Sequence, residues 1–290
     1  MQNIETLRDL AEQYETRDFI NGDPSWFMHQ VEGKANIEVT AFVASALSYG
    51  SRKQFMPKIQ YMLDCANNNI YEWIVSNRYA IDIPDDDTCY YRLYNRHAMN
   101  QFLSALKCLL DKYGSIGEYV KSCSSTGLEA VNAITQWFAN HNGGPVIPKD
   151  TTSACKRVCM FLRWMVRNNS PVDLGLWSEF IDKRTLIMPM DTHVVQEAIS
   201  LGLLNSKSNS MSNAVKLTNK LSEILVFIAE KDGFPIKTNN ETFNLYKEYL
   251  RKKLENEATV AVWQITETER ELIELSSTPT DEMEEISYIT

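Results

Sequence analysis

Long apolar runs are missing from this 290-residue chain, and none approaches the roughly 18 residues that a membrane-spanning helix needs. The N-terminal stretch MQNIETLRDLAEQ is polar and has the pattern of a helix, so it lacks the apolar segment of a signal peptide. We therefore expect a cytoplasmic protein without a membrane partner.

Several sequence patterns that mark enzyme classes are also missing. The chain has no glycine-rich phosphate loop, no Ser-x-x-Lys pattern and no Ser-His-Asp order with the right local turn. Its six cysteines are scattered, which favours a reducing compartment over a disulfide framework. Cys155 and Cys159 are four residues apart, but no further pair has the spacing of metal ligands, and no cysteine follows Cys159 to hold a C-terminal iron–sulfur cluster. We expect neither a metal nor a cofactor.

Negative charge is concentrated at one end of the chain. The formal net charge is −9, and residues 254–290 contain ten acidic residues but one basic residue. Residues 1–253 are therefore close to neutral, and between 149 and 184 seven Lys or Arg outnumber four Asp or Glu. Nucleic-acid affinity depends on such a local patch and not on overall charge. The last thirty residues are rich in Glu, Ser and Thr, so we expect the tail 257–290 to be partly disordered.

Apolar residues recur at helical spacing in almost every segment, so we predict an all-α protein with few strands. The stretch Gly143-Gly144-Pro145 predicts a linker, so a helical domain over 1–256 divides into possible lobes 1–142 and 146–256, with any site in the cleft between them. The predicted helices span residues 4–19, 37–49, 52–66, 69–78, 95–112, 129–139, 152–167, 192–202, 211–230 and 240–256.

The helix predicted over 152–167 carries cations along one side. At 100° per residue, Lys156, Arg163 and Arg167 share a face opposite the apolar residues. The stripe is either the solvated face of an amphipathic helix or a surface that contacts phosphates. If Ser153 caps the helix, Lys156 lies in the first turn, where the helix dipole lowers the pKa of an amine. A neutral lysine amine is the form that attacks as a nucleophile, so Lys156 is a candidate for Schiff-base chemistry.

One carboxylate stands at the entrance of the next helix. In the segment LIMPMDTHVVQEAISLGL, Asp191 precedes a short amphipathic helix that ends at Gly202. A helix cap is the ordinary role of such an aspartate. The cap also holds the carboxylate rigidly, and one oxygen can still face a cleft. His193 is more often a packed or supporting residue than a catalytic one.

Four segments carry a resemblance to a known family: NIEVTAFVASALSYGSRKQ (36–54), SACKRVCMFLRWMVR (153–167), VDLGLW (172–177) and LIMPMDTHVVQEAISLGLL (186–204). Over roughly residues 1–230 the chain resembles an uncharacterised bacterial family, typical of Bacteroidetes. That family is distantly similar to the helix-hairpin-helix DNA glycosylases, and most of all to the archaeal 8-oxoguanine glycosylases. In those enzymes the nucleophilic lysine lies well before the aspartate, an arrangement that Lys156 and Asp191 fit.

The resemblance implies a two-lobed glycosylase-like fold and a DNA glycosylase/lyase that releases a damaged base, with 8-oxoguanine as one candidate. Lys156 and Asp191 would be catalytic. Nucleic-acid contacts would come from Arg157, Arg163, Arg167 and His193. Trp164 or Trp177 would stack on a base, although such aromatics are more often core residues. The chain departs from the superfamily at the hairpin, because residues 168–187 contain a single glycine, Gly175, where a Gly-x-Gly normally holds a DNA phosphate.

Two other functions stay open. The chain fits a non-catalytic nucleic-acid-binding protein with a glycosylase-like fold, which its neutral body and incomplete hairpin favour. It also fits a helical protein-interaction module that uses the acidic tail as its contact segment.

Overall fold

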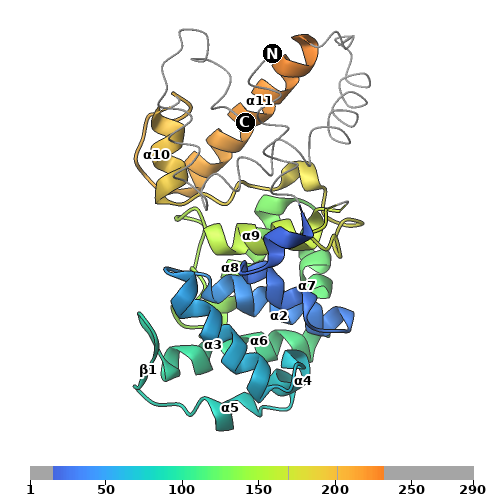
Figure 1. The fold of residues 1–290 in the computed structure, drawn as a ribbon, viewed down its shortest axis with the longest axis vertical. Helices are drawn as coiled ribbons and strands as arrows, with labels where there is room; N and C mark the ends of the chain where they lie inside the picture. The colour runs from blue at the N-terminus through green and yellow to red at the C-terminus, as the bar shows by residue number, and fades with distance from the viewer. Residues whose placement is uncertain (1–15, 169, 201, 232–290) are drawn as a thin grey trace. The chain divides into compact units, whose positions relative to one another are not determined.

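Helices dominate the computed structural model, which describes residues 16–231 apart from Asn169 and Leu201 (Figure 1). The all-α class is confirmed, apart from one two-stranded antiparallel hairpin. The predicted helix over 240–256, the tail 257–290 and most of the predicted helix 4–19 lie outside the described residues. The chain forms two compact units: unit 2 spans residues 20–189, and unit 1 contains the described residues 16–19 together with those from Met190 onward.

The elements follow one another along the chain with short connections. In unit 2 they are η2 (Pro24–His29), α2 (Lys34–Leu47), α3 (Arg52–Cys65), α4 (Ile70–Val75), α5 (Tyr79–Asp82), β1 (Cys89–Tyr91), β2 (Tyr94–Asn95), α6 (Arg96–Tyr113), α7 (Ile116–Cys123), α8 (Gly127–Asn140), α9 (Lys156–Val166) and η3 (Lys183–Thr185). Unit 1 contributes α10 (Thr192–Ser200) and α11 (Met211–Lys231), and η1 (Arg17–Ile20) lies at the boundary. No described helix combines the length and the apolar composition needed to cross a membrane.

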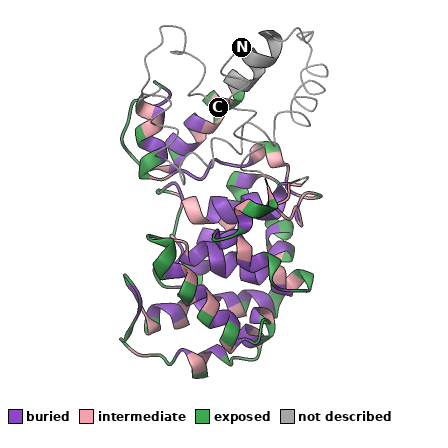
Figure 2. Cartoon of the chain, in the orientation of Figure 1, coloured by how far each residue is buried: buried purple, intermediate pink, exposed green. Residues whose placement is uncertain are grey.

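Helix α2 is the centre of unit 2. Its sequence, KANIEVTAFVASAL, is apolar on almost every side, and a helix of that kind is stable when neighbours cover it all round. Five elements do so: η2, α3, α4, α7 and α9. Figure 2 shows α2 as buried along most of its length. The helix ends at Leu47, two residues earlier than the sequence predicts, and Gly50 follows with a φ of +84°.

Aromatic rings fill the space beside α2. Phe42 lies 5.0 Å from Phe161, 5.5 Å from Phe138 and 5.9 Å from Phe102, measured between ring centroids. All four rings are almost completely buried. Each such pair contributes about 0.5–1.5 kcal/mol beyond the burial of its surface. The rings come from α2, α6, α8 and α9, so this cluster joins four helices of the core.

The predicted linker at Gly143–Pro145 lies within unit 2. Helix α8 before it packs against α9 after it, and both are part of the same compact unit. The structure places the boundary between units at Pro189–Met190.

Several short elements of the fold are not predicted from the sequence, among them α7 and the hairpin. Helix α7 is short and begins at Ile116, after Ser115, whose hydroxyl caps the helix by accepting from the Glu118 amide. The hairpin of β1 and β2 has too few residues to show an alternating pattern. By contrast, the start of α8 has a local signal in the sequence, since Thr126 and Glu129 form a reciprocal capping box there.

The Glu38 carboxylate is buried on α2 and links three parts of unit 2. It accepts hydrogen bonds from the Ile116 amide (2.7 Å), the Gly117 amide (3.0 Å) and the Trp177 indole nitrogen (2.7 Å). A buried carboxylate without such donors would be strongly destabilising. Burial raises the pKa of Glu38 to about 7, although the three hydrogen bonds act in the opposite direction.

We predict that stability decreases with rising pH because of Glu38. The folded-state pKa lies above the unfolded value, so the folded protein keeps this proton to higher pH than the unfolded chain does. The free energy of unfolding should fall by about 3 kcal/mol between roughly pH 4.5 and pH 7 through this group.

Urea unfolding of the wild type and of Glu38→Gln at several pH values measures this effect. The variant has no proton to lose at this position, so its stability should decline less steeply over the same range. Parallel declines in the two proteins would contradict the prediction, since all other titrating groups are shared.

Candidate functional site

Helix α9 starts at Lys156, and its N-cap residue is not the one that the sequence predicts. The predicted Ser153 cap is wrong: the residue before the helix is Cys155, in the left-handed conformation with a φ of +50°, and no side chain caps the helix. The Cys155 thiol donates to the Asp150 and Ser153 carbonyl oxygens, which holds the turn before the helix. Lys156 is consequently the first residue of α9, and it is half-buried.

Arg157 follows Lys156 and points back to α2. Its guanidinium donates to the carbonyl oxygen of Ala46, in the last turn of that helix. Carbonyl groups in the last turn have no partner within a helix, so an arginine there both pairs one of them and complements the helix dipole. The same guanidinium lies over the ring of Tyr49.

The predicted exposed stripe of three cations on α9 is wrong. Arg163 and Arg167 are each only 6% exposed, and the Nε atoms of both lie close to one Asp173 oxygen, at 3.2 and 3.0 Å. The Asp173 side chain is fully buried. These arginines therefore compensate a buried carboxylate, and of the three predicted cations Lys156 is the one that reaches the surface.

The segment after α9 explains this burial, because it folds back over the C-terminal end of the helix. The amides of Leu174 and Gly175 donate to the Trp164 carbonyl, and the Trp177 amide donates to the Met165 carbonyl. Gly175 has a φ of +64°, and a Cβ there would lie 3.0 Å from the Arg167 carbonyl oxygen. The single glycine of the predicted hairpin therefore permits close packing on α9.

Trp164 and Trp177 are core residues, with exposed fractions of 2% and 0%. The Trp177 ring packs edge-on against Phe161 at 5.2 Å while its nitrogen donates to Glu38. Both tryptophans therefore have the core role that is the more common one for such aromatics, and neither ring is on the surface where it would stack on a nucleic-acid base.

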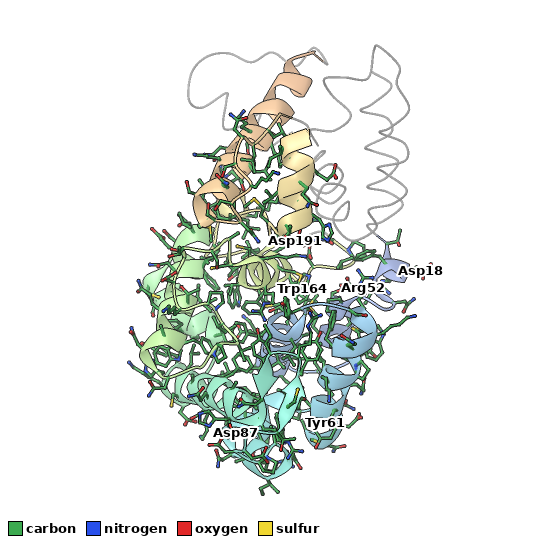
Figure 3. All side chains as sticks on the ribbon, turned by 90° about the vertical axis from the view of Figure 1, so that its left-hand side faces the viewer. Asp18, Arg52, Tyr61, Asp87, Trp164 and Asp191 are labelled. Atoms are coloured by element: carbon green, nitrogen blue, oxygen red, sulfur yellow. The ribbon has the colours of Figure 1, made fainter. Side chains whose placement is uncertain are left out.

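Asp191 lies at the start of α10 in unit 1, where Figure 3 labels it. One of its carboxylate oxygens accepts from the His193 amide (3.0 Å) and the Val194 amide (3.1 Å), so the predicted capping role is confirmed. His193 itself is exposed. Lys156 belongs to unit 2, and its pairing with Asp191 stays a prediction.

Two residues that fix the segments around α9 are not predicted from the sequence. These are Glu38, which accepts from α7 and Trp177, and Asp173, which pairs with Arg163 and Arg167. A usable signal exists for Glu38, because it is the one charged residue between Asn36 and Leu47 in an otherwise apolar helix. Asp173 has no local signal, since its partners are ten and six residues away on a helix that it packs against. Within the described ranges of the chain, no three His, Cys, Asp or Glu residues gather as metal ligands would.

We predict that Asp173→Asn destabilises the protein by about 3–5 kcal/mol, because it leaves two buried guanidinium groups without their shared negative charge. Chemical denaturation of the full chain measures the loss. Asp182→Asn is the matched control: Asp182 pairs with the partly exposed Arg184, and its removal should cost less than about 1 kcal/mol. Equal losses in the two variants would contradict the role assigned to Asp173.

Comparison with known proteins gives one match. The model of a family described as a protein of unknown function, DUF2400, matches residues 23–232. No curated protein and no solved structure matches the chain, so the similarity to DNA glycosylases stays a proposal. The family match covers well over half of the sequence, including unit 2 almost entirely together with α10 and α11. The chain thus belongs to the DUF2400 family of proteins of unknown function.

Proposed function

We propose that this protein is a DNA glycosylase/lyase-like enzyme that releases a damaged base, with 8-oxoguanine as the first candidate. The observation that carries the proposal is the position of Lys156. It is the first residue of α9 and half-buried, and the helix behind it is anchored in the core through Phe161 and Trp164. A reactive lysine needs this combination of a rigid backbone and a side chain that reaches a substrate.

The proposed reaction proceeds through a Schiff base. A damaged nucleotide leaves the base stack, at a cost of a few kcal/mol. The neutral Lys156 amine attacks C1′ of the sugar, the bond from C1′ to the base nitrogen breaks, and the base leaves with the bonding electrons and takes up a proton. Ring opening of the sugar gives an iminium between Lys156 and C1′. Loss of a C2′ proton then expels the 3′ phosphate by β-elimination.

Asp191 has a supporting role in this proposal. Its carboxylate would stabilise the positive charge that develops on the sugar and assist proton transfer. The capping hydrogen bonds from the His193 and Val194 amides support this role, because they fix the orientation of the carboxylate before any substrate binds. The two-lobed helix-hairpin-helix architecture is part of the same proposal.

A non-catalytic nucleic-acid-binding or protein-interaction protein with a glycosylase-like fold is the second candidate, because residues with which the proposed enzyme would hold a duplex are engaged within unit 2. Two of the cations proposed for phosphate binding, Arg163 and Arg167, are buried against Asp173. The glycine of the predicted hairpin, Gly175, also packs against α9. Tight binding to a duplex would then need other residues.

We predict that borohydride traps a covalent adduct between the purified protein and an 8-oxoguanine duplex. Lys156→Ala should abolish the adduct, because no amine remains at that position. Asp191→Asn should slow its formation by about 10²-fold or more, since it removes the charge that stabilises the transition state.

Lys149→Ala is the matched control, because Lys149 is an exposed lysine seven residues before Lys156. It should trap as well as the wild type does. Absence of an adduct on 8-oxoguanine, on other damaged bases and on abasic sites would overturn the enzyme in favour of the binding protein. A full yield of adduct from Lys156→Ala would overturn the role of this lysine.

A further inference from the structure

Two arginines from distant parts of the chain meet at one exposed tyrosine of unit 2. The Tyr49 side chain follows α2 and is 39% exposed. The guanidinium carbon of Arg92 lies 4.8 Å from the centre of its ring, and that of Arg157 lies 5.9 Å from the same point. Arg92 comes from the turn between β1 and β2, and Arg157 comes from the first turn of α9, next to Lys156.

The backbone around this cluster holds the three side chains in place. The Tyr91 hydroxyl donates to the Tyr49 carbonyl oxygen, which ties the hairpin to the segment after α2. Arg157 donates to the Ala46 carbonyl oxygen. Gly50 has a φ of +84°, and the Arg92 guanidinium lies where a Cβ of residue 50 would stand. The side chains are therefore positioned before any ligand binds, which lowers the entropic cost of binding.

Neither guanidinium has a carboxylate partner among the residues that the structure describes. Five other arginines of the described part of the chain have a carboxylate partner: Arg52, Arg96, Arg163, Arg167 and Arg184.

Two further cations follow Tyr49 closely in the sequence. Lys53 is exposed in the first turn of α3, next to Arg52, which Figure 3 labels. Acidic residues are present as well: Asp23 is buried and pairs with Arg52, Asp150 is exposed before α9, and residues 85–87, three aspartates, precede the hairpin that carries Arg92. The two guanidinium groups themselves thus place positive charge at an accessible aromatic ring.

We propose that Tyr49, Arg92 and Arg157 bind the sugar–phosphate backbone of a DNA strand beside Lys156. This site rests on the proposed function. It takes the place of Arg163 and Arg167 as the phosphate-binding surface, because those two arginines are buried. A planar guanidinium forms paired hydrogen bonds with phosphate oxygens, and it is more weakly hydrated than an ammonium group. Arg157 and Lys156 both lie in the first turn of α9, so a strand bound here lies at the same end of the helix as the proposed nucleophile.

The test is the salt dependence of DNA binding by the full-length protein, measured by fluorescence anisotropy on undamaged single-stranded and duplex oligonucleotides. Arg92→Ala should weaken binding about fivefold or more at low salt, to a similar extent on every sequence. It should also reduce the slope of log K against log salt by about 0.7–0.9, the value for one lost phosphate contact. Arg157→Gln, which keeps a donor for the Ala46 carbonyl, should do the same.

Two variants control for charge and for folding. Arg78→Ala removes another exposed arginine of unit 2, at the start of α5, and should leave affinity and slope unchanged. Arg92→Lys keeps the charge, so it should restore most of the slope, but it lacks the planar fork and should recover only part of the affinity.

The site would be overturned if the wild type did not bind DNA, or if Arg92→Ala kept the affinity and the salt slope of the wild type. It would also be overturned if polyglutamate displaced the labelled oligonucleotide as effectively as unlabelled DNA of equal charge does. Binding that depends on Arg92 without any borohydride adduct would support the site and reject the proposed enzyme. An adduct that forms while Arg92→Ala binds as the wild type does would reject the site and leave the proposed enzyme standing.

Discussion

The buried carboxylate of Glu38 is the constraint on which the rest of unit 2 depends. Helix α2 is covered on nearly all sides, so the one acidic group in its core has no access to water and must receive hydrogen bonds from protein. The donors are the first amides of α7 and the indole of Trp177, from positions 78, 79 and 139 residues further along the chain. Satisfying one carboxylate thereby fixes where α7 begins and where the segment after α9 lies.

That segment carries the second buried charge of the unit. Asp173 lies four residues before Trp177 and pairs with Arg163 and Arg167, so the same stretch is held to α9 by an ion-pair cluster and to α2 by Glu38. The C-terminal half of α9 is covered as a result, and the surface of the helix is reduced to its first turn. Lys156 and Arg157 lie in that turn, on a helix that can move little. A nucleophile and a phosphate-binding residue both need such a rigid base.

Much of the fold is predictable from local patterns. Helices α2, α3, α6, α8 and α9 come from apolar periodicity, and the start of α8 comes from the Thr126–Glu129 pair. Two predictions that fail concern α9, namely its Ser153 cap and its exposed stripe of cations. Periodicity puts Arg163 and Arg167 on a polar face, and it contains no information on the segment around Asp173 that covers them. The position of Lys156 in the first turn of a helix is predictable. The meeting of Tyr49 and Arg92 with Arg157 is not, because these residues come from separate segments that only the tertiary structure brings together.

The central claim is that a lysine at the start of α9 forms a covalent bond with the sugar of a damaged nucleotide. Peptide mapping by mass spectrometry of the borohydride-reduced complex, after digestion with nuclease and protease, tests it most directly. The account predicts one modified peptide, with the sugar remnant on Lys156. A remnant on another lysine or on the N-terminal amine, or none on any peptide, would contradict it.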